Sequence, residues 1–412
     1  RSGSEIAATL ARADMRDLML VKESAYEKLK KSRTLKVLTS SPRREYNLKP
    51  FLKSHWPLGL DSVSFEPVRG NVPTRIKKLI EGDSDALILA KAGFDRLLSA
   101  EGAEFDETRV ELRRHLTVCR WMILPLSENP GAAAQGALAI EIKRGRPDLQ
   151  ELLHEIHDGE TYRSVFRERE ILSSYGGGCH QKIGASVLPR EYGDVVFLKG
   201  LTDDGRVLDS TELVRKNSTW PKPDSNQAIF PLETKASFFD RESVVVSDRS
   251  ASPLWIARAD ALPTGWTPSN FVWASGLETW KKLAERGVWV NGSSEGLGED
   301  ENQRLEILAG GMVPWVKLSH DEGVSGTTHE FLATYKLVPK ASKPDIQGKT
   351  HFYWMSGSSF LHAVALEPAI RNAYHFCGPG NTLGIIQKNL GPEGHVWVFL
   401  NHKQWLKEMG AR

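Results

Sequence analysis

The strongest constraint on the fold is an alternation of short apolar runs with helical patterns over the first 148 residues. LKVLTS (35–40), SVSFEPV (62–68) and DALILA (85–90) are typical of strands, and PRREYNLKPFLKSH and PTRIKKLIEG between them have helical patterns. TVCRWMILPL (117–126) and GALAIEIK (136–143) add two more apolar runs. Strands that alternate with helices form βαβ units, which build parallel sheets. We therefore predict an α/β lobe with a parallel sheet in this part.

Three further patterns divide the first half of the chain. The opening RSGSEIAATLARADMRD is expected to lead quickly into a helix. Residues 146–172 have a strongly helical pattern, and the short strands and turns after them predict a small sheet packed on those helices. Residues 217–252 contain prolines and many polar residues, which are typical of an extended linker.

The last part of the chain differs in composition. Nine of the twelve tryptophans follow residue 250, which predicts a domain boundary near there. FVWASG (271–276) and FYWMSG (352–357) are each followed by a helical stretch, a strand and a Gly-rich turn. This loose repeat predicts two similar α/β lobes that enclose a cleft. The alternative is the convergence of two ordinary βα turns.

Charge and cysteine content exclude several classes of function. The chain has 54 Lys and Arg against 52 Asp and Glu, a formal net charge of +2, so any anion site depends on local clusters. No apolar run approaches the ~20 residues that span a bilayer, and the start does not resemble a signal peptide. Three cysteines without a CxxC pair favour a reducing compartment. We expect a cytoplasmic protein that binds neither nucleic acid nor membranes.

Two arginines follow the first predicted strand. Ser40 and Ser41 are candidate N-caps ahead of Pro42, which places Arg43 and Arg44 in the first helical turn. The helix macrodipole is already positive there, so two cations are better explained if an anion binds at this helix N-terminus. The alternative is a pair of solvated surface arginines.

The same arrangement recurs after the second strand. Arg69 follows the strand, Gly70 and Asn71 occupy the turn, and Arg75 lies in the first turn of the next helix. Ligands of open α/β sheets bind at the carboxyl ends of the strands. Guanidinium groups bind carboxylates or phosphates with two hydrogen bonds. Because no Walker or dinucleotide glycine pattern is present, we predict a polycarboxylate ligand rather than a nucleotide.

A third candidate is the stretch SSYGGGCHQKIGAS (173–186), in which three glycines lead directly into Cys179. Glycine permits positive φ and the close approach of another group. A thiol in such a loop is expected to carry or bind something. The alternative is burial as a small apolar side chain.

These motifs resemble those of a known family. RGNVPTRIKKLIEGDSDALILAKAGFDRL (69–97) resembles the signature of hydroxymethylbilane synthase, also called porphobilinogen deaminase. TSSPRREYNL, PGAAAQGALAIEIK (130–143) and REREILSSYGGGCHQKIGA resemble further segments of that family, in the correct order over about residues 5–200. The resemblance implies a transferase of tetrapyrrole (heme) biosynthesis that joins four porphobilinogen molecules into hydroxymethylbilane. It also implies a dipyrromethane cofactor, held by a thioether bond to cysteine, as the primer.

The resemblance assigns roles to individual residues. Cys179 is implied as the attachment point, and the arginines and their turns are implied to bind carboxylates of cofactor and substrate; this cofactor-binding set is Arg43, Arg44, Arg69, Arg75, Ser40, Ser41, Gly70 and Asn71. No metal or nucleotide is implied.

The chain also departs from the family's pattern. Pro42 stands at a usual leucine, Gly176 at a usual glutamate and Lys182 at a usual proline, and Ala132 to Ala134 lengthen one loop. The SLKD segment, whose aspartate serves as the catalytic acid, is absent, so that residue is unassigned. Asp83, Asp85 and Asp95 are interpreted as ordinary solvated carboxylates. Either a preceding segment supplies the acid, or this chain alone is not a competent deaminase.

The C-terminal repeat has a resemblance of its own. The two lobes with their Ser-Gly turns, the connecting stretch TYKLVP (334–339) and CGPGNT resemble uroporphyrinogen III synthase, a lyase that closes hydroxymethylbilane with inversion of the last ring. Tyr335 is a possible proton-transfer residue, with simple packing as the alternative. Backbone N–H and hydroxyl groups at helix N-termini are implied to bind substrate carboxylates; the residues are Ser275, Gly276, Ser356, Gly357, Gly378, Gly380, Asn381 and Thr382.

The sequence thus predicts a multidomain, multifunctional α/β enzyme. Its expected parts are a periplasmic-binding-protein-like α/β lobe (1–128), the return strand of an otherwise absent first deaminase lobe (129–148), a small α+β domain with the cofactor cysteine (149–216), a linker (217–252) and a two-lobed α/β cyclase-type domain (253–412). Its expected partners are porphobilinogen and hydroxymethylbilane. Two alternatives remain: a non-catalytic polycarboxylate-binding module, and a chain in which only the C-terminal cyclase is active. The oligomeric state is not predicted.

Overall fold

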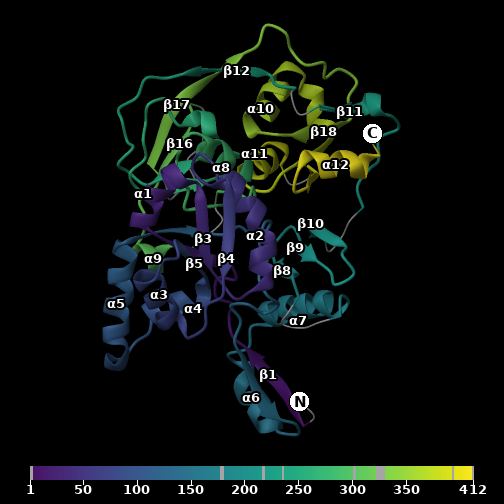
Figure 1. The fold of residues 1–412 in the computed structure, drawn as a ribbon. Helices are drawn as coiled ribbons and strands as arrows, with labels where there is room; N and C mark the ends of the chain where they lie inside the picture. Colours follow the sequence, from purple (N-terminus) through teal and green to yellow (C-terminus); the bar gives the residue numbers. More distant parts are fainter. Residues whose placement is uncertain are drawn as a thin grey trace. The chain divides into compact units, whose positions relative to one another are not determined.

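The chain folds into two compact units, each with a mixed α/β architecture built on several sheets (Figure 1). The computed structural model describes residues 3–176, 181–215, 219–233, 236–299, 303–321, 330–391 and 394–410. The first unit comprises Arg1–Val214, Ala284–Gly292 and Arg304–Met312, and the second comprises Arg215–Leu283, Ser293–Gln303 and Val313–Arg412. The expectation of a multidomain α/β chain is confirmed at this level.

A five-stranded sheet forms the core of the first unit. Its strand order is β4-β3-β5-β2-β6, and β3 runs parallel to both β4 and β5, as the alternating pattern predicted. The strands are β2 (Asp17–Lys22), β3 (Thr34–Leu38), β4 (Ser62–Glu66), β5 (Ala86–Ala90) and β6 (Cys119–Ile123). The connecting helices are α1 (Glu23–Ser32), α2 (Pro42–His55), α3 (Val72–Glu81), α4 (Lys91–Leu98) and α5 (Asp106–Thr117).

The prediction of a purely parallel sheet is wrong for one strand. β2 runs antiparallel to both β5 and β6, so the sheet is mixed. Its sequence, DLMLVK, contains the apolar run LMLV, in which Leu and Met are also good helix formers, and neither the type nor the direction of the element can be read from such a run. Leu18, Met19 and Val21 are fully buried, so burial on both faces of the sheet determines the structure here.

The opening residues form a strand rather than the expected helix. β1 (Ser4–Thr9) pairs antiparallel with β7 (Ala139–Lys143) in a separate two-stranded sheet. The predicted helical stretch 146–172 divides into α6 (Pro147–His154), which packs on β1, and α7 (Gly159–Ser173). The small sheet that follows is antiparallel, with β8 (Gly184–Leu188) packed on α7, then β9 (Asp194–Leu201) and β10 (Val207–Val214).

The second unit contains two sheets. One sheet is fully parallel and has the order β11-β18-β19-β20. The other has the order β12-β17-β16-β13-β14-β15. In it, β12 runs antiparallel to β17, and β17, β16, β13 and β14 run parallel to one another. The strands are β11 (Ile229–Phe230), β12 (Phe239–Ser243), β13 (Leu254–Ile256), β14 (Val272–Ala274), β15 (Gly292–Ser293), β16 (Val316–His320), β17 (Glu330–Pro339), β18 (His351–Trp354), β19 (Tyr374–Cys377) and β20 (Val396–Val398).

The helices of the second unit are α8 (Leu277–Glu285), whose last two residues belong to the first unit, α10 (Gly357–Leu366), α11 (Asn381–Leu390) and α12 (His402–Met409). Helix α9 (Glu306–Ala309) belongs to the first unit. Short 3₁₀ helices lie at Ala103–Phe105 in the first unit and at Asn226–Ala228, Ala259–Ala261 and Pro368–Asn372 in the second.

Residues 217–252, expected to form an extended linker, belong to the second unit. They contribute β11 to the four-stranded sheet and β12 to the six-stranded sheet, and the chain returns from the second sheet to the first through β17. Tryptophans form much of the core beside them: Trp273, Trp280, Trp354 and Trp405 are fully buried. Burial of these large side chains accounts for the tryptophan-rich composition of this part.

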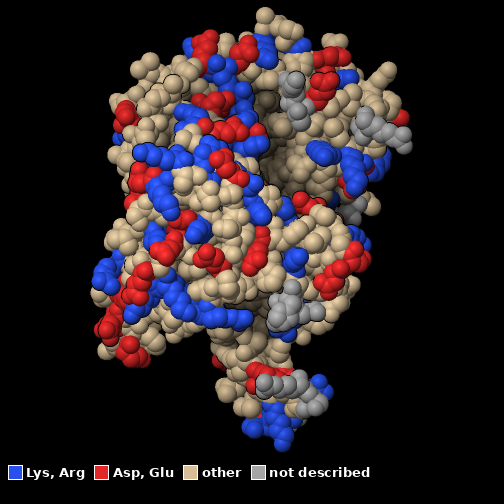
Figure 2. All heavy atoms as spheres, in the orientation of Figure 1, with Lys and Arg blue, Asp and Glu red and all other residues tan. Residues whose placement is uncertain are grey.

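Two expectations about the molecular surface can be compared with the structure. Within the described parts of the chain, no helix is long and apolar enough to cross a membrane. On the face shown in Figure 2, basic and acidic side chains are interspersed rather than gathered into one field of a single sign. Binding of an anion therefore depends on local geometry, as the net charge of +2 indicated.

Candidate functional site at the sheet edge

Asp17 organises the edge of the five-stranded sheet. Its register partner is Ala90, the last residue of β5, so Asp17 lies at the carboxyl end of the parallel strands. Arg43 and Arg44 reach this edge from the start of α2. Arg44 donates from Nη2 to Asp17 Oδ1 at 2.7 Å and from Nε to Oδ2 at 2.9 Å, and Arg43 Nη2 donates to Oδ2 at 3.0 Å. The two predicted arginines thus share one internal carboxylate.

Two amides from the following loop complete this cluster. Asn129 donates to Asp17 Oδ2 at 2.8 Å and accepts from Arg43 Nη1 at 2.9 Å. Gln135 donates to Asp17 Oδ1 at 2.9 Å and to the carbonyl of Met15 at 2.7 Å. Asp17 therefore accepts five hydrogen bonds while only 1% of its surface is exposed.

The neighbours of Asp17 determine its protonation state. Burial alone would raise the pKa of Asp17, but attraction to Arg44 and Arg43 and the hydrogen bonds from Arg44 and Asn129 outweigh it. The pKa of Asp17 consequently lies well below its ordinary value, and the carboxylate is ionised near neutral pH. Two guanidinium groups and one carboxylate leave a net charge of +1 in a nearly buried cluster.

The second arginine pair lies in a more open setting. Arg69 is exposed, while Arg75 is half-buried and donates from Nε to the carbonyl of Gly70 at 2.7 Å. Asn71 caps α3, because its Oδ1 accepts from the backbone N–H of Thr74 at 2.9 Å. Gly70 has φ +123°, and a Cβ there would approach Thr74 Cγ2 to 2.8 Å, so the turn requires glycine.

The two serines have different roles. Ser40 Oγ donates to the carbonyl of Val68 at 2.8 Å and accepts from its N–H at 2.9 Å. It therefore joins the turn before α2 to the turn before α3. Ser41 is the N-cap of α2, but its side chain makes no capping hydrogen bond.

The three cysteines differ in what the structure says of them. Cys179 lies outside the described residues. Cys119 on β6 and Cys377 on β19 are buried free thiols, and burial raises their pKa values to about 11 and about 12. Both therefore stay protonated at neutral pH and are poor nucleophiles.

Helix α7, which leads toward Cys179, is held by a buried carboxylate. Glu168 is fully buried and accepts from Arg12 Nη1 and Nη2 at 2.7 and 2.8 Å. It also accepts from the backbone N–H groups of Ala134 and Val187, each at 2.8 Å. One side chain thus joins α7 to the opening segment, to the loop before β7 and to β8.

The interpretation of nearby aspartates as solvated is wrong for two of the three. Asp83 is exposed, but Asp85 and Asp95 are only 3% and 8% exposed. Asp85 accepts from the backbone N–H of Lys36 at 2.8 Å, which is a structural role. Burial raises the pKa of Asp95, and an ion pair with the fully buried Lys91 opposes the rise. Asp85 directly precedes β5 and Asp95 lies within α4, and neither context reveals the burial of the side chain.

In the second unit, the two predicted Gly-rich turns lie against each other. A Cβ added to Gly380 would lie 2.7 Å from Gly298 Cα, so only glycines permit this backbone contact. Beside them, Asn381 donates to Glu299, and Lys317 forms an ion pair with Glu299 although both charged residues are buried. The Gly-rich turn of each predicted lobe therefore contributes to one polar cluster.

The remaining residues implied for substrate binding lie at the predicted turns. Ser356 is the N-cap of α10, where its side chain accepts from Ser359, and Gly357 is the buried first residue of that helix. Ser275 donates from Oγ to the carbonyl of Ala257 at 2.6 Å. The others are Gly276, before α8, and Gly378 and Thr382, which flank the start of α11.

Tyr335 is 5% exposed on β17, with its ring centroid 5.9 Å from that of His320. Burial raises its pKa above the ordinary value, so its phenol is protonated at neutral pH. Among the described residues, no group of three His, Cys, Asp or Glu side chains is placed to hold a metal ion.

Comparison with known proteins shows what the first part of the chain resembles. Residues 1–151 match the family model described as "Porphobilinogen deaminase, dipyromethane cofactor binding domain". This part of the chain is therefore similar to the cofactor-binding domain of porphobilinogen deaminase. The cofactor of the matched family is covalently linked to a cysteine.

Curated relatives agree with this assignment. The chain is 33% identical over 208 residues to the porphobilinogen deaminase of Mycolicibacterium gilvum. The matched region covers 50% of this chain and 56% of the relative. It is 35% identical over 184 residues to that of Chromobacterium violaceum (44% and 51%), and 36% identical over 162 residues to a probable one of Methanocaldococcus jannaschii (39% and 46%). The chain thus spans about half the length of these relatives.

A solved structure concerned with glutathione import in Gram-positive bacteria covers 45% of this chain at 13% identity, but its TM-score of 0.20 is too low to carry an argument.

The sequence did not reveal the residues that hold Arg43 and Arg44 in place. Asp17 lies 26 positions from Arg43, and Asn129 and Gln135 lie 112 and 118 positions from Asp17. The fold brings these residues together, and no local pattern indicates all of these contacts. One signal was available. Asp17 directly precedes the apolar run LMLV, and an aspartate at such a strand end is a candidate partner for arginines at the same sheet edge.

Proposed function

We propose that this chain acts in tetrapyrrole biosynthesis and that its deaminase domain carries a dipyrromethane primer on Cys179. The observation that carries the proposal is the match of residues 1–151 to the cofactor-binding domain of porphobilinogen deaminase. The raised pKa values of Cys119 and Cys377 add support, because they disfavour the other two thiols as attachment points. When bound, the dipyrromethane supplies the pyrrole chain to which further porphobilinogen units are added.

The residues at the sheet edge fit a polycarboxylate. Arg69 and Arg75 form no ion pair with the described residues, so both guanidinium groups are available to bind carboxylates. Arg43 and Arg44 are already engaged by Asp17, and they contribute the net charge of +1 and fix the start of α2. We therefore assign direct carboxylate binding first to Arg69 and Arg75, with Gly70 and Asn71 shaping their turn, and a supporting role to Arg43, Arg44, Ser40 and Ser41.

The chemistry of ammonia release needs a general acid. Asp17 does not suit that role. Its pKa is lowered, and its carboxylate oxygens accept hydrogen bonds from donors, so it has no proton to give. Among the described residues of this edge, the proposal therefore assigns binding and orientation but no acid. A deaminase reaction by this chain needs an acid from elsewhere. A non-catalytic polycarboxylate-binding module is the alternative, and it would bind porphobilinogen without forming hydroxymethylbilane.

Replacing Arg75 by glutamate is expected to reduce the fraction of protein that carries the cofactor by about tenfold or more, because a cation that binds carboxylates becomes a repelling anion. Intact mass spectrometry of protein produced with porphobilinogen present measures that fraction. Lys77→Glu on the same helix is the matched control, since Lys77 is exposed and pairs with Glu81. Equal loading of Arg75→Glu, Lys77→Glu and the unaltered protein would contradict the assignment.

We further propose that the second unit is a uroporphyrinogen III synthase-type cyclase. Its two sheets, joined through β12 and β17, support two α/β lobes, and the Gly-rich turns of both meet at Gly298 and Gly380. In this proposal Ser275, Gly276, Ser356, Gly357, Gly378, Gly380, Asn381 and Thr382 bind substrate carboxylates, and Tyr335 donates a proton. In the second alternative, only this cyclase is active and the deaminase domain serves as a scaffold.

Supplying hydroxymethylbilane tests the cyclase directly. We expect the type III isomer of uroporphyrinogen, and formation of the type I isomer alone, as in spontaneous closure, would refute the assignment. Tyr335→Phe should shift the product toward the type I isomer if its hydroxyl transfers a proton. An unchanged isomer ratio would leave Tyr335 with packing alone.

A further inference from the structure

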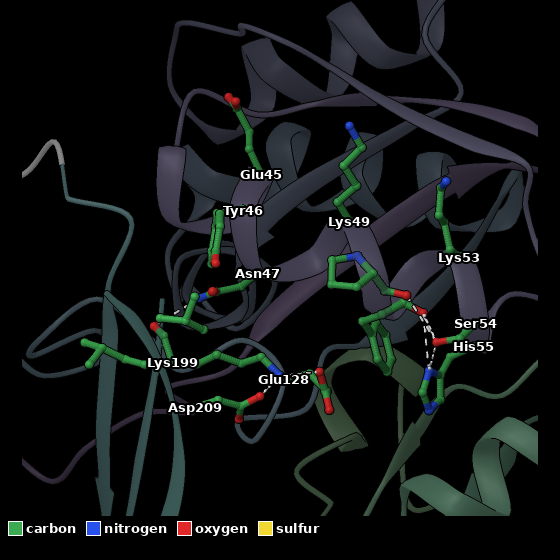
Figure 3. A pocket seen from close by; sticks show the side chains of 14 residues that line it. Glu45, Tyr46, Asn47, Lys49, Lys53, Ser54, His55, Glu128, Lys199 and Asp209 are labelled. Carbon is green, nitrogen blue, oxygen red and sulfur yellow. Dashed lines mark hydrogen bonds and ion pairs between the residues drawn. The ribbon is translucent and has the colours of Figure 1, made fainter. Parts of the chain in front are cut away.

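A pocket separate from the sheet edge lies in the first unit, between α2 and the β9–β10 hairpin (Figure 3). Its volume is about 680 Å³, within the range typical of small-molecule sites. Phe51 and Leu208 are buried and give the pocket an apolar wall, to which Pro50 and Val207 add. Phe51 stacks on His55, with centroids 4.4 Å apart and planes inclined by 20°, so part of this wall is aromatic.

One buried polar atom in this pocket lacks a partner. Asn47 lines the pocket and is 1% exposed, and its amide nitrogen donates to the carbonyl of Lys199 at 3.4 Å. Its Oδ1 is buried and accepts no hydrogen bond from any described residue. A buried acceptor without a donor costs about 1–3 kcal/mol, and a ligand N–H placed here would remove that cost.

Most charged residues around the pocket fall into two groups, and Glu45 lies on the same side as Lys49 (Figure 3). On one side, Lys199 is held between Glu128 at 2.8 Å and Asp209 at 3.3 Å, so its charge is already neutralised. On the other side, Lys49 and Lys53 are exposed on α2 and form no ion pair with the described residues. An anionic group on a ligand is therefore attracted to the Lys49 and Lys53 side.

We propose that this pocket binds a planar aromatic carboxylate that also carries an N–H donor. The aromatic ring packs against Phe51 and Leu208, the N–H donates to Asn47 Oδ1, and the carboxylate binds Lys49 and Lys53. The three contacts come from one helix and one hairpin of the same unit, and they involve none of the residues assigned to the cofactor. The inference is therefore independent of the proposed function.

Calorimetric titration of the full chain with indole-3-propionate tests this proposal. We expect saturable binding that weakens about tenfold or more in Val207→Trp, which fills the exposed mouth of the pocket, and in the double variant Lys49→Glu/Lys53→Glu. Lys31→Glu, an exposed lysine on α1, is the matched control and should bind as the unaltered protein does. 3-Phenylpropionate, which lacks the N–H, should bind about tenfold more weakly than indole-3-propionate.

Four results would overturn the proposal. They are the absence of saturable binding, equal binding by Val207→Trp or by the double lysine variant, equal affinity for 3-phenylpropionate, and loss of binding in Arg69→Glu/Arg75→Glu. The last result would place the ligand at the sheet edge instead. Because Val207, Lys49 and Lys53 are all exposed, these variants are expected to fold, which far-UV circular dichroism would verify.

Discussion

Replacing Asp17 by alanine is expected to destabilise the first unit by about 3–5 kcal/mol. The substitution leaves two guanidinium groups, those of Arg43 and Arg44, nearly buried without their counter-ion. It also removes the acceptor for the amides of Asn129 and Gln135. Because a whole domain is stable by only about 5–15 kcal/mol, this single change removes a large share of the free energy of unfolding.

Urea unfolding followed by far-UV circular dichroism measures this loss. The exposed carboxylate Asp83 provides the control, and Asp83→Ala should change the free energy of unfolding by no more than about 0.5 kcal/mol. A loss below about 1 kcal/mol in Asp17→Ala would show that the cluster does not hold this edge together.

The same cluster predicts a dependence on pH. The pKa of Asp17 is lowered in the folded chain, so the unfolded state binds the proton first as pH falls. The stability that Asp17 contributes is therefore fully present above its unfolded pKa of about 3.9 and is lost as pH decreases below it. The difference in stability between the unaltered protein and Asp17→Asn should accordingly shrink below about pH 4.

Replacing Glu168 by alanine is expected to cost a similar amount, about 3–5 kcal/mol. The change leaves the Arg12 guanidinium without its carboxylate, and it also leaves the N–H groups of Ala134 and Val187 unpaired. Glu168→Gln should lose less, since an amide oxygen still accepts hydrogen bonds. Thermal unfolding compares these variants with Glu170→Ala, an exposed glutamate on the same helix.

The expected consequence of the Glu168 change extends to the cofactor. Glu168 joins α7 to β8, the elements on either side of the segment that contains Cys179. We therefore expect Glu168→Ala to load less cofactor than Glu170→Ala. Equal stability and equal loading of the two variants would contradict the role assigned to Glu168.

Local signals in the sequence accounted for much of the first unit. Pro42 at the start of α2 and Gly82 at the end of α3 mark helix ends by backbone restrictions that act within a few residues, so these bounds could be predicted. The direction of β2 could not, because an apolar run specifies burial but not the neighbour with which it pairs. β1 was missed for the same reason, as its partner β7 lies about 135 positions away.

The candidate site shows the same division. The positions of Arg69 and Arg75 around a glycine turn followed from the spacing of a strand and a helix. That Arg43 and Arg44 are nearly buried against Asp17 depends on strand register, which no local pattern encodes. The two pairs of arginines therefore differ in a way that the sequence did not reveal. Asp17 neutralises part of the charge of Arg43 and Arg44, whereas Arg69 and Arg75 are open to a ligand.

The intact mass of the protein shows whether Cys179 carries a covalent dipyrromethane. We expect protein produced with porphobilinogen present to exceed the sequence mass by two linked pyrrole units, with Cys119→Ala and Cys377→Ala retaining the excess and Cys179→Ser losing it. An unmodified mass for the unaltered protein, or an excess that persists in Cys179→Ser, would contradict the account.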